Sequence, residues 1–478
     1  MREPDKRTKW TYCIGATGRD AAYALVSMYL ISYIQYTMQL TAAQFAAISA
    51  CMVAAMIWDA VNDPLMGIII ENSHLKGGKF RPWILIGVLA NALVIILLFN
   101  IRPQGWGFVI FFAISYFLWG MTYTMNDIAY WGMLPSLSSD PGVRNTLITI
   151  MSIFICVGQF AVAGIVPTVI AGNAVRAYGI IAVVVAFAFI AFQLLTFFGV
   201  REQPRRDNPH LSLGGMFKVF ARNDQLIAAG IACLLFNVGQ NLLIVFGVNF
   251  FYIEFGYSEG GGHIFLFTVM YGLGTLCSQA IFSLLSKHFK RTALLTFCMI
   301  LLFVSYGLFL SFGFVLPKIP LLIHATGFII FFCQGLFNLV LLVMVNNTIE
   351  YDELRHGERH DSVISAARSF AVKLAGGINQ GISALVLIIS GIYAITQSVS
   401  ALEVDVATGA LTSEGALSLA DQYLSQVSRT QSFTLRLGMV LIPVIAIFGA
   451  YLILRIKYRI DEKEYDRIVS EIESRKAS

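Results

Sequence analysis

Charged side chains are scarce in this chain. Asp, Glu, Lys and Arg make up 13% of its 478 residues, whereas hydrophobic residues make up 57%. A soluble domain carries about 25% charged residues, and a mean hydropathy of +0.73 is also too high for one. The composition therefore excludes a series of soluble globular domains and predicts a membrane protein built from apolar helices.

Motifs of membrane-embedded enzymes and ATP-driven pumps are also missing. The sequence contains no HExxH, no GxGD and no Gly-rich nucleotide-binding loop ending in Lys and Ser/Thr. Its seven cysteines lie in apolar segments without paired spacing, which favours small packing residues over a disulfide or metal framework. We therefore expect no enzyme activity and no cofactor. An intramembrane enzyme, or a passive channel or sensor, is the less favoured alternative.

Long apolar runs are abundant, and a span needs about 20 such residues. We predict twelve spans, at 10–38, 44–72, 82–101, 106–136, 145–172, 177–200, 223–254, 263–286, 292–315, 319–348, 364–395 and 431–457. The predicted fold is an all-α membrane protein with two six-helix bundles. The N-terminal bundle covers 1–200 and the C-terminal bundle 223–457, joined by a central cytoplasmic loop at 201–222 and followed by a cytoplasmic tail at 458–478.

Loops that are rich in Lys and Arg alternate along the chain with loops that contain few or none. The N-terminus, the loop before residue 82, the central loop and the tail are basic, whereas residues 374–428 contain no Lys or Arg. Because basic loops stay on the cytoplasmic side, both termini are predicted to be cytoplasmic. This places the net charge of +5 against the anionic cytoplasmic leaflet and gives no reason to expect a nucleic-acid partner.

A few ionisable side chains lie within the predicted spans, where each costs about 2.5–3.5 kcal/mol on insertion scales. We single out Arg19, Asp20, Asp59, Asp63, Asp127, Arg368 and Lys373. Among these the acids all come from the first half, while the span at 364–395 contributes only cations. This distribution predicts a cavity lined by negative charge from one bundle, with a lysine opposite.

Asp59 and Asp63 are four residues apart and share one face of a helix. Two carboxylates this close cannot both ionise cheaply, so either one is protonated or a cation lies between them. Asn62, Thr124 and the carbonyl freed by Pro64 add oxygens of the kind that a hard cation takes. An alternative is that the pair lies at the cytoplasmic end and meets the basic loop.

Three further groups are candidates for substrate contacts. Asp127 and Trp131 share a helix face, where a carboxylate for hydroxyl donors beside a flat indole suits a sugar ring; alternatively, Trp131 is an interfacial belt residue. Asp20 either contacts substrate or only pairs with the adjacent Arg19. Lys373 lies about nine residues into its span, which favours a cavity position over snorkelling to the interface.

Several motifs together resemble those of the glycoside–pentoside–hexuronide:cation symporters, the melibiose permease family of the major facilitator superfamily. The stretch "DAVNDPLMG…GGKFRPW" at 59–83 carries most of the resemblance. "GRD" in the first span, "YTMNDIAYWGMLPSL" in the fourth, "EYDELRHGERHDS" and "VKLAGG" around the eleventh, and "YRIDEKEYDRI" in the tail follow in order. The resemblance covers the whole chain.

This resemblance implies a major facilitator fold and transport of a sugar or glycoside coupled to Na⁺ or H⁺, with Li⁺ as a further option. By motif position it implies a cation site, including a bound Na⁺, formed by Asp59, Asn62, Asp63 and Thr124. It likewise implies a substrate site formed by Arg19, Asp20, Asp127, Trp131 and Lys373. The chain departs from the family at Ser152, where the melibiose permease has a sugar-contacting arginine, so the sugar itself stays open.

The implied setting is a bacterial cytoplasmic membrane, in which the chain is a multi-pass monomer surrounded by lipid. One alternative within the same family is a transporter of a non-sugar substrate such as a lysolipid, for which an apolar cavity is expected. Asp127 and Trp131 favour a hydroxylated substrate.

Overall fold

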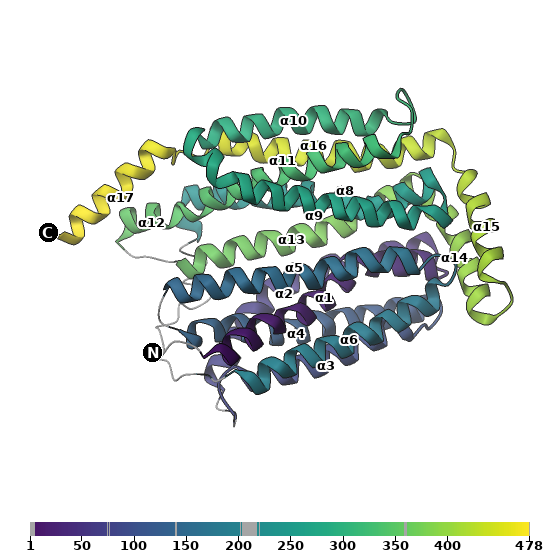
Figure 1. Cartoon of the computed structure of the whole chain (residues 1–478), viewed down its shortest axis with the longest axis horizontal. Coiled ribbons are helices and arrows are strands. Elements are labelled where there is room, and N and C mark those ends of the chain that lie inside the picture. The colour runs from purple at the N-terminus through teal and green to yellow at the C-terminus, as the bar shows by residue number, and fades with distance from the viewer. Residues whose placement is uncertain are drawn as a thin grey trace. The chain divides into compact units, whose positions relative to one another are not determined.

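The computed structural model describes residues 5–73, 75, 77–138, 141–200, 202, 218, 220–357 and 361–477, and these are nearly all helical (Figure 1). The helices are α1 (Lys6–Thr37), α2 (Ala42–Asn72), α3 (Arg81–Asn100), α4 (Trp106–Leu137), α5 (Pro141–Val169), α6 (Ala174–Gly199), α8 (Asp224–Phe255), α9 (Tyr257–His288), α10 (Arg291–Ser311), α11 (Pro320–Asn346), α12 (Thr348–His356), α13 (Asp361–Ile389), α14 (Ile392–Thr408), α15 (Ser413–Ser425), α16 (Arg429–Ile456) and α17 (Glu462–Ala477). The predicted all-α class is confirmed. Most of the predicted central loop, 201–222, lies outside the described residues.

Eleven helices in these ranges are long and apolar enough to cross a membrane. The predicted span that is not among these eleven is α1. Its mean hydropathy is too low for this criterion, although its length is sufficient. Its 32 residues reach about 48 Å at 1.5 Å per residue, more than the ~30 Å hydrocarbon core. The buried residues of α1 include Arg19, Asp20 and Gln35, so its polar side chains face protein and not lipid.

Capping groups fix the starts of α2, which carries part of the candidate site, and of α3, which packs against α4. Thr41 and Gln44 form a capping box at the start of α2, in which each side chain accepts the other's backbone N–H. The start of α3 has no side-chain cap of its own. Instead, the Glu202 carboxylate accepts the backbone N–H groups of Lys79 and Arg81 at 2.8 and 2.7 Å, which satisfies donors that a helix start leaves unpaired.

Packing divides the chain into two compact units. The first contains residues 1–208, 251–265 and 387–431, and the second contains residues 209–250, 266–386 and 432–478. In the first unit, α1 packs against α5 and α6, and α4 packs against α2 and α3. The first unit thus holds the first six long helices and also α14 and α15, which follow much later in the sequence.

The segment after α13 differs from the prediction. The span predicted at 364–395 ends at Ile389, because Gly391 adopts a left-handed conformation (φ 73°) that interrupts the helix. Residues 396–430, which the predicted spans leave as a loop, instead contain most of α14 and all of α15. Figure 1 shows this pair at the end of α1–α6 that is remote from the N-terminus.

A buried carboxylate attaches α14 to the rest of the first unit. Glu403 is 1% exposed and accepts the backbone N–H groups of Gly172 and Ala174 at 2.7 and 2.6 Å. It also accepts the hydroxyl of Tyr257 at 2.9 Å. Burial raises the pKa of Glu403, although these hydrogen bonds oppose the increase. Asp421 of α15 makes a similar attachment, because it accepts the hydroxyl of Ser258 at 2.7 Å.

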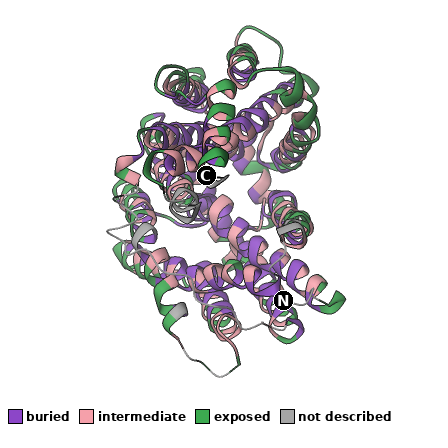
Figure 2. Ribbon diagram, turned by 90° about the vertical axis from the view of Figure 1, so that its left-hand side faces the viewer, coloured by how far each residue is buried: buried purple, intermediate pink, exposed green. Residues whose placement is uncertain are grey.

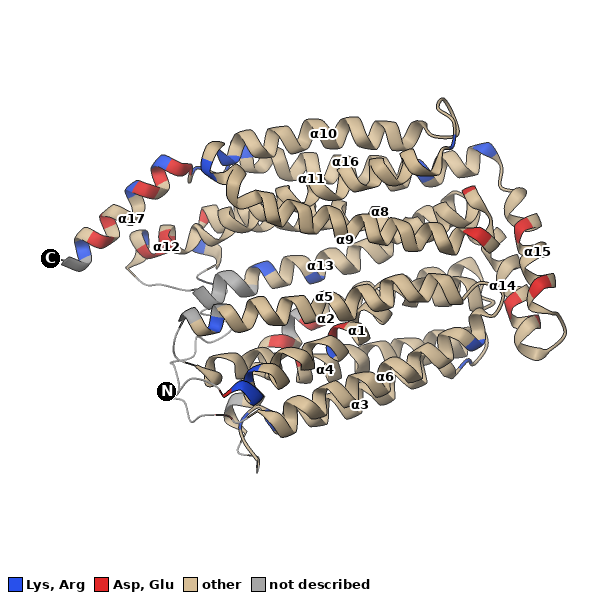
Figure 3. Cartoon of the chain, viewed as in Figure 1, with Lys and Arg blue, Asp and Glu red and all other residues tan. Residues whose placement is uncertain are grey.

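Exposed and buried positions separate as expected for helices surrounded by lipid. Figure 2 shows buried positions on faces that the helices within a unit turn toward one another. On the outward face of α6, Ile180, Phe187 and Phe198 are 63%, 64% and 66% exposed. Figure 3 shows most charges at helix ends and on α12, α15 and α17, with a small group inside the first unit near α1 and α2. That internal group is the candidate site.

Candidate functional site

One face of α4 organises the internal charges of the first unit. Gly120, Thr124, Asp127 and Trp131 are spaced at i, i+4, i+7 and i+11, which places them along one stripe of the helix. Gly120 and Thr124 approach α2, while Asp127 and Trp131 approach α1. The stripe therefore connects two groups of carboxylates that come from different helices.

The α2 group contains Asp59 and Asp63, and the helix continues through Pro64 from Ala42 to Asn72. Thr124 Oγ1 donates to Asp63 Oδ1 at 3.0 Å. Asp59 is 9% exposed and lies against Gly120, where a Cβ atom would come within 2.9 Å of its Oδ1. The absence of a side chain at position 120 thus makes room for this carboxylate beside the α4 backbone.

Asn62 lies on the same buried face of α2 as the two acids. It is 8% exposed, and its Nδ2 has no hydrogen-bond partner among the described residues. A buried amide without a partner is costly. Carboxylate, amide and hydroxyl oxygens, the kinds that Asp59, Asp63, Asn62 and Thr124 carry, are those that hard cations such as Na⁺ bind. The described residues hold no cluster of three or more His, Cys, Asp or Glu side chains suited to a metal.

The α1 group is centred on Arg19, which is 2% exposed. Its Nε and terminal nitrogen donate to Asp20 Oδ2 at 3.0 and 2.7 Å. Another terminal nitrogen lies 3.2 Å from Asp127 Oδ1, an ion-pair distance without hydrogen-bond geometry. Arg19 therefore bridges α1 and α4. Arg19 and Asp20 therefore do pair. Neighbouring positions point about 100° apart around a helix, but the long arginine side chain reaches the adjacent carboxylate.

Two aromatic rings enclose the Arg19 guanidinium. Its central carbon lies 4.7 Å from the centre of the Tyr130 ring and 5.4 Å from that of Trp131. Tyr130 is held in turn by Tyr12, whose ring stacks on it at 4.7 Å. Trp131 is 39% exposed, so part of its indole remains open while Asp127 beside it is 29% exposed. Among the acids and aromatic rings around Arg19, Trp131 and Asp127 leave the most surface for a ligand.

Gln159 of α5 belongs to this network, although we did not predict it from the sequence. Its Nε2 donates to Asp20 Oδ1 at 3.2 Å. The preceding residue, Gly158, allows α5 to approach α1 so closely that a Cβ atom there would clash with the carbonyl oxygen of Thr17. A glutamine directly after a glycine in an otherwise apolar span is the signal that could have indicated it.

Aromatic residues lie between the two groups of carboxylates. The Tyr23 ring of α1 is 6.2 Å from Trp119 and 5.3 Å from Tyr123, both on α4. Trp119 is 3% exposed, and its indole nitrogen has no hydrogen-bond partner among the residues described. The site therefore contains a buried donor in addition to its acids.

Two further positions named from the sequence are Lys373 and Ser152. Lys373 is half-buried on α13 in the second unit, so its role beside the acids of the first unit stays a prediction. Ser152 of α5 is exposed, and its hydroxyl donates to the carbonyl of Ile148 in its own helix at 2.8 Å. The family resemblance implies a sugar-contacting arginine at this position, and Ser152 does not supply its positive charge.

The family described as MFS/sugar transport protein matches residues 11–462 of the chain. The chain belongs to this family. The relation extends to sequences at 26–27% identity. A raffinose carrier protein from Pediococcus pentosaceus is 27% identical over 80% of the chain and 62% of its own length. A lactose permease from Lactobacillus helveticus is 26% identical over 98% of the chain and 72% of its own length.

The family belongs to the major facilitator superfamily, and solved transporter structures share the fold of this family member. The nucleoside transporter NupG superposes with a TM-score of 0.63 at 13% identity, covering 93% of this chain and 99% of that one. At this identity the likeness concerns the fold alone. The family match identifies a membrane transport protein and not an enzyme, and the apolar helices make it multi-pass. The bacterial plasma membrane is consistent with the relatives.

Proposed function

We propose that this family member is a secondary active transporter that couples Na⁺ or H⁺ to the uptake of a sugar or glycoside by alternating access. The observation that carries the proposal is the stripe on α4. Thr124 contacts the acid pair of α2, and Asp127 and Trp131 contact Arg19 of α1. Since Thr124 and Asp127 are three residues apart, about 4.5 Å along the helix axis, a cation at one group lies within electrostatic reach of the other.

The α1 group has the chemistry that a sugar needs. The carboxylates of Asp20 and Asp127 accept hydrogen bonds from hydroxyl groups, and Arg19 donates. The partly open Trp131 ring offers a flat surface for the C–H face of a sugar ring. The names of the raffinose carrier and the lactose permeases agree with such a substrate.

The α2 group has the chemistry of a coupling site. Its two carboxylates repel each other when both are ionised, and a bound cation removes that repulsion. Na⁺ uses both acids together with the neutral oxygens of Asn62 and Thr124, whereas H⁺ needs only one acid. In this proposal the transported cation is a second substrate, and the four side chains that would hold it all belong to the first unit.

Uptake into proteoliposomes tests this function. The purified protein is reconstituted and given raffinose, lactose, melibiose or a glucuronide under an inward Na⁺ gradient, an inward proton gradient, or neither. We expect at least one of these glycosides to accumulate above its external concentration under one gradient, and only to equilibrate without one. Asp405→Asn, which changes an exposed aspartate on α14, is the control variant and retains uptake.

Two results would contradict the proposal. Equal equilibration under all three conditions would indicate a passive pathway. Gradient-driven uptake of a lysolipid, with no glycoside accumulated, would assign the chain to a non-sugar substrate.

A further inference from the structure

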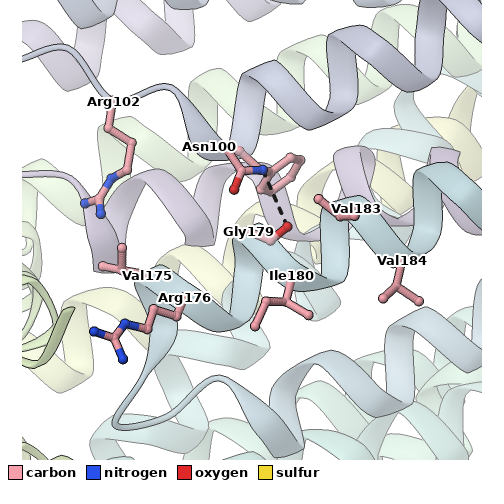
Figure 4. Close-up of a pocket in the computed structure, with 9 residues that line it drawn as sticks. Asn100, Arg102, Val175, Arg176, Gly179, Ile180, Val183 and Val184 are labelled. Atoms are coloured by element: carbon pink, nitrogen blue, oxygen red, sulfur yellow. Dashed lines mark hydrogen bonds between the residues drawn. The ribbon is translucent and has the colours of Figure 1, made fainter.

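A pocket of about 450 Å³ lies between α3 and α6 in the first unit, away from the internal carboxylates. It is lined by Phe99, Asn100, Arg102, Val175, Arg176, Gly179, Ile180, Val183 and Val184 (Figure 4). The end of α3 and the beginning of α6 meet here, and Asn100 joins them by donating to the carbonyl of Gly179 at 3.4 Å. The pocket therefore lies at the border between spanning helix and connecting loop.

The polar end of the pocket holds two arginines, Arg102 and Arg176. Arg102 donates to the carbonyl of Thr37 and lies 3.3 Å from the sulfur of Met38. Arg176 donates to the carbonyl of Ala407 at 3.0 Å. Within the described part of the chain neither arginine forms an ion pair with a carboxylate. Burial lowers the pKa of Arg102 from its ordinary value, as expected for a cation without an anion beside it.

The other end of the pocket is apolar and faces outward. Ile180, Val183 and Val184 follow Arg176 at i+4, i+7 and i+8, on the same face of α6. Ile180 and Val184 are 63% and 60% exposed. From Arg176 to Val184 the helix rises about 12 Å. Figure 4 shows the guanidinium groups of Arg102 and Arg176 at one side of the pocket and Val183 and Val184 at the other.

These features match the two parts of a phospholipid. An anionic head group pairs with cations at the membrane interface, and an acyl chain covers apolar side chains that lead away from that interface. We propose that this pocket binds an anionic phospholipid, with its phosphate between Arg102 and Arg176 and an acyl chain along α6. A free anion would leave the apolar wall unused. A zwitterionic lipid would bring a cation of its own beside the two arginines, whereas an anionic lipid with an uncharged head-group alcohol brings only the negative charge of its phosphate.

Native mass spectrometry of the delipidated protein in detergent measures this binding directly. Phosphatidylglycerol and phosphatidylcholine with identical acyl chains are compared, and inorganic phosphate is added as a competitor. We expect wild-type protein to retain phosphatidylglycerol in preference. Arg176→Gln should weaken retention about fivefold, which corresponds to the ~1 kcal/mol of one basic residue at an anionic surface, and the double variant with Arg102→Gln should weaken it further.

Two control variants separate the pocket from general charge. Arg429→Gln removes an exposed arginine at the start of α16 and should leave retention unchanged. Val183→Trp keeps both arginines but fills the apolar end, and should reduce retention. Because Arg102 also supports the Thr37 carbonyl, the exposed Arg176 decides the test if the double variant fails to fold.

The proposal is overturned if Arg176→Gln binds phosphatidylglycerol as wild type does, or if Arg429→Gln weakens binding equally. It is also overturned if inorganic phosphate displaces the lipid, since the site would then bind a free anion.

Discussion

At the scale of single residues, a substitution of Asp63 is the most direct test of the proposed cation site. Its carboxylate accepts the Thr124 hydroxyl and lies one helical turn from Asp59. Asp63→Asn keeps the size of the side chain and an oxygen for Thr124 but removes the charge. We expect this variant to fold and to lose concentrative uptake, because a neutral amide neither holds a coupling cation nor carries a proton.

Thermal unfolding and gradient-driven uptake of the Asp63→Asn protein are the measurements. Asp405→Asn, on the exposed side of α14, controls for the loss of one carboxylate. Normal substrate accumulation by Asp63→Asn would remove this residue from the coupling site.

Trp131 tests the sugar half of the site. Its indole is the most exposed aromatic surface beside Arg19 and Asp127. Trp131→Ala removes this surface without removing a charge, so we expect sugar affinity to fall about tenfold or more, equal to ~1.4 kcal/mol, while Na⁺ binding stays measurable. Calorimetry with the sugar accumulated in proteoliposomes gives both values.

Trp106→Ala is the matched control, because Trp106 is 56% exposed on the first turn of the same helix. If Trp131→Ala binds sugar as well as Trp106→Ala does, the ring is an interfacial residue and the substrate lies elsewhere.

The sequence predicted the charges of the site better than their connections. Spacing alone placed Asp59 with Asp63, and Asp127 with Trp131, on shared helix faces. The link from Thr124 to Asp63, and the position of Arg19 between Asp20 and Asp127, depend on contacts between α1, α2 and α4. Such contacts between distant segments leave no local pattern.

At the scale of elements, α14 and α15 could not be predicted from hydropathy. The segment after Ser390 lacks a long apolar run, and its attachment depends on Glu403, whose partners lie more than 140 residues away in the chain. A single acidic residue in a polar segment resembles any solvated side chain. The helix start of α3 is a similar case, since its capping carboxylate comes from Glu202.

The buried Glu403 predicts how the stability of this element depends on pH. Its pKa is raised in the folded protein, so the folded state binds a proton more tightly than the unfolded chain does. Stability therefore falls as pH rises from the ordinary glutamate value of about 4.3 toward the raised value. Glu403→Gln, which stays neutral, should remove this dependence.

Thermal unfolding of both proteins between about pH 4 and pH 7 measures the difference. The melting temperature of wild type should decline relative to Glu403→Gln as pH rises, and Glu414→Gln, an exposed change on α15, should follow wild type. Glu403→Ala should cost about 1–3 kcal/mol at each pH, because it leaves buried donors without an acceptor. Parallel curves for wild type and Glu403→Gln would show that this group does not titrate in the range.

At the scale of the whole molecule, the number and order of the long helices could be predicted from the apolar runs along the sequence. Eleven of the twelve predicted spans are helices of sufficient hydropathy. The twelfth, α1, contains the Arg19–Asp20 pair, which lowers its hydropathy at the position where the site needs charge. The orientation of the termini stays a prediction from the distribution of Lys and Arg.

Coupling is the property that belongs to the whole transporter. The stripe on α4 carries Thr124, which contacts the acid pair, and Asp127, which contacts Arg19. If the two groups bind cation and sugar as we propose, each ligand alters the charge near the other. We expect Na⁺ to tighten sugar binding and sugar to tighten Na⁺ binding by the same factor, because linkage is reciprocal. A typical coupling of ~1–3 kcal/mol corresponds to about 5- to 150-fold.

Calorimetric titration of sugar at fixed pH, with choline replacing Na⁺ at constant ionic strength, measures this factor. Asp59→Cys should reduce the Na⁺ effect more than any proton-driven uptake, because Asp63 still carries a proton when its neighbour is neutral. A sugar affinity that does not change with Na⁺, beside uptake that follows only the pH gradient, would make the chain a proton symporter. The second carboxylate, Asp59, would then have no role as a cation ligand, and the pair would carry a proton in place of Na⁺, since two adjacent carboxylates do not both ionise cheaply.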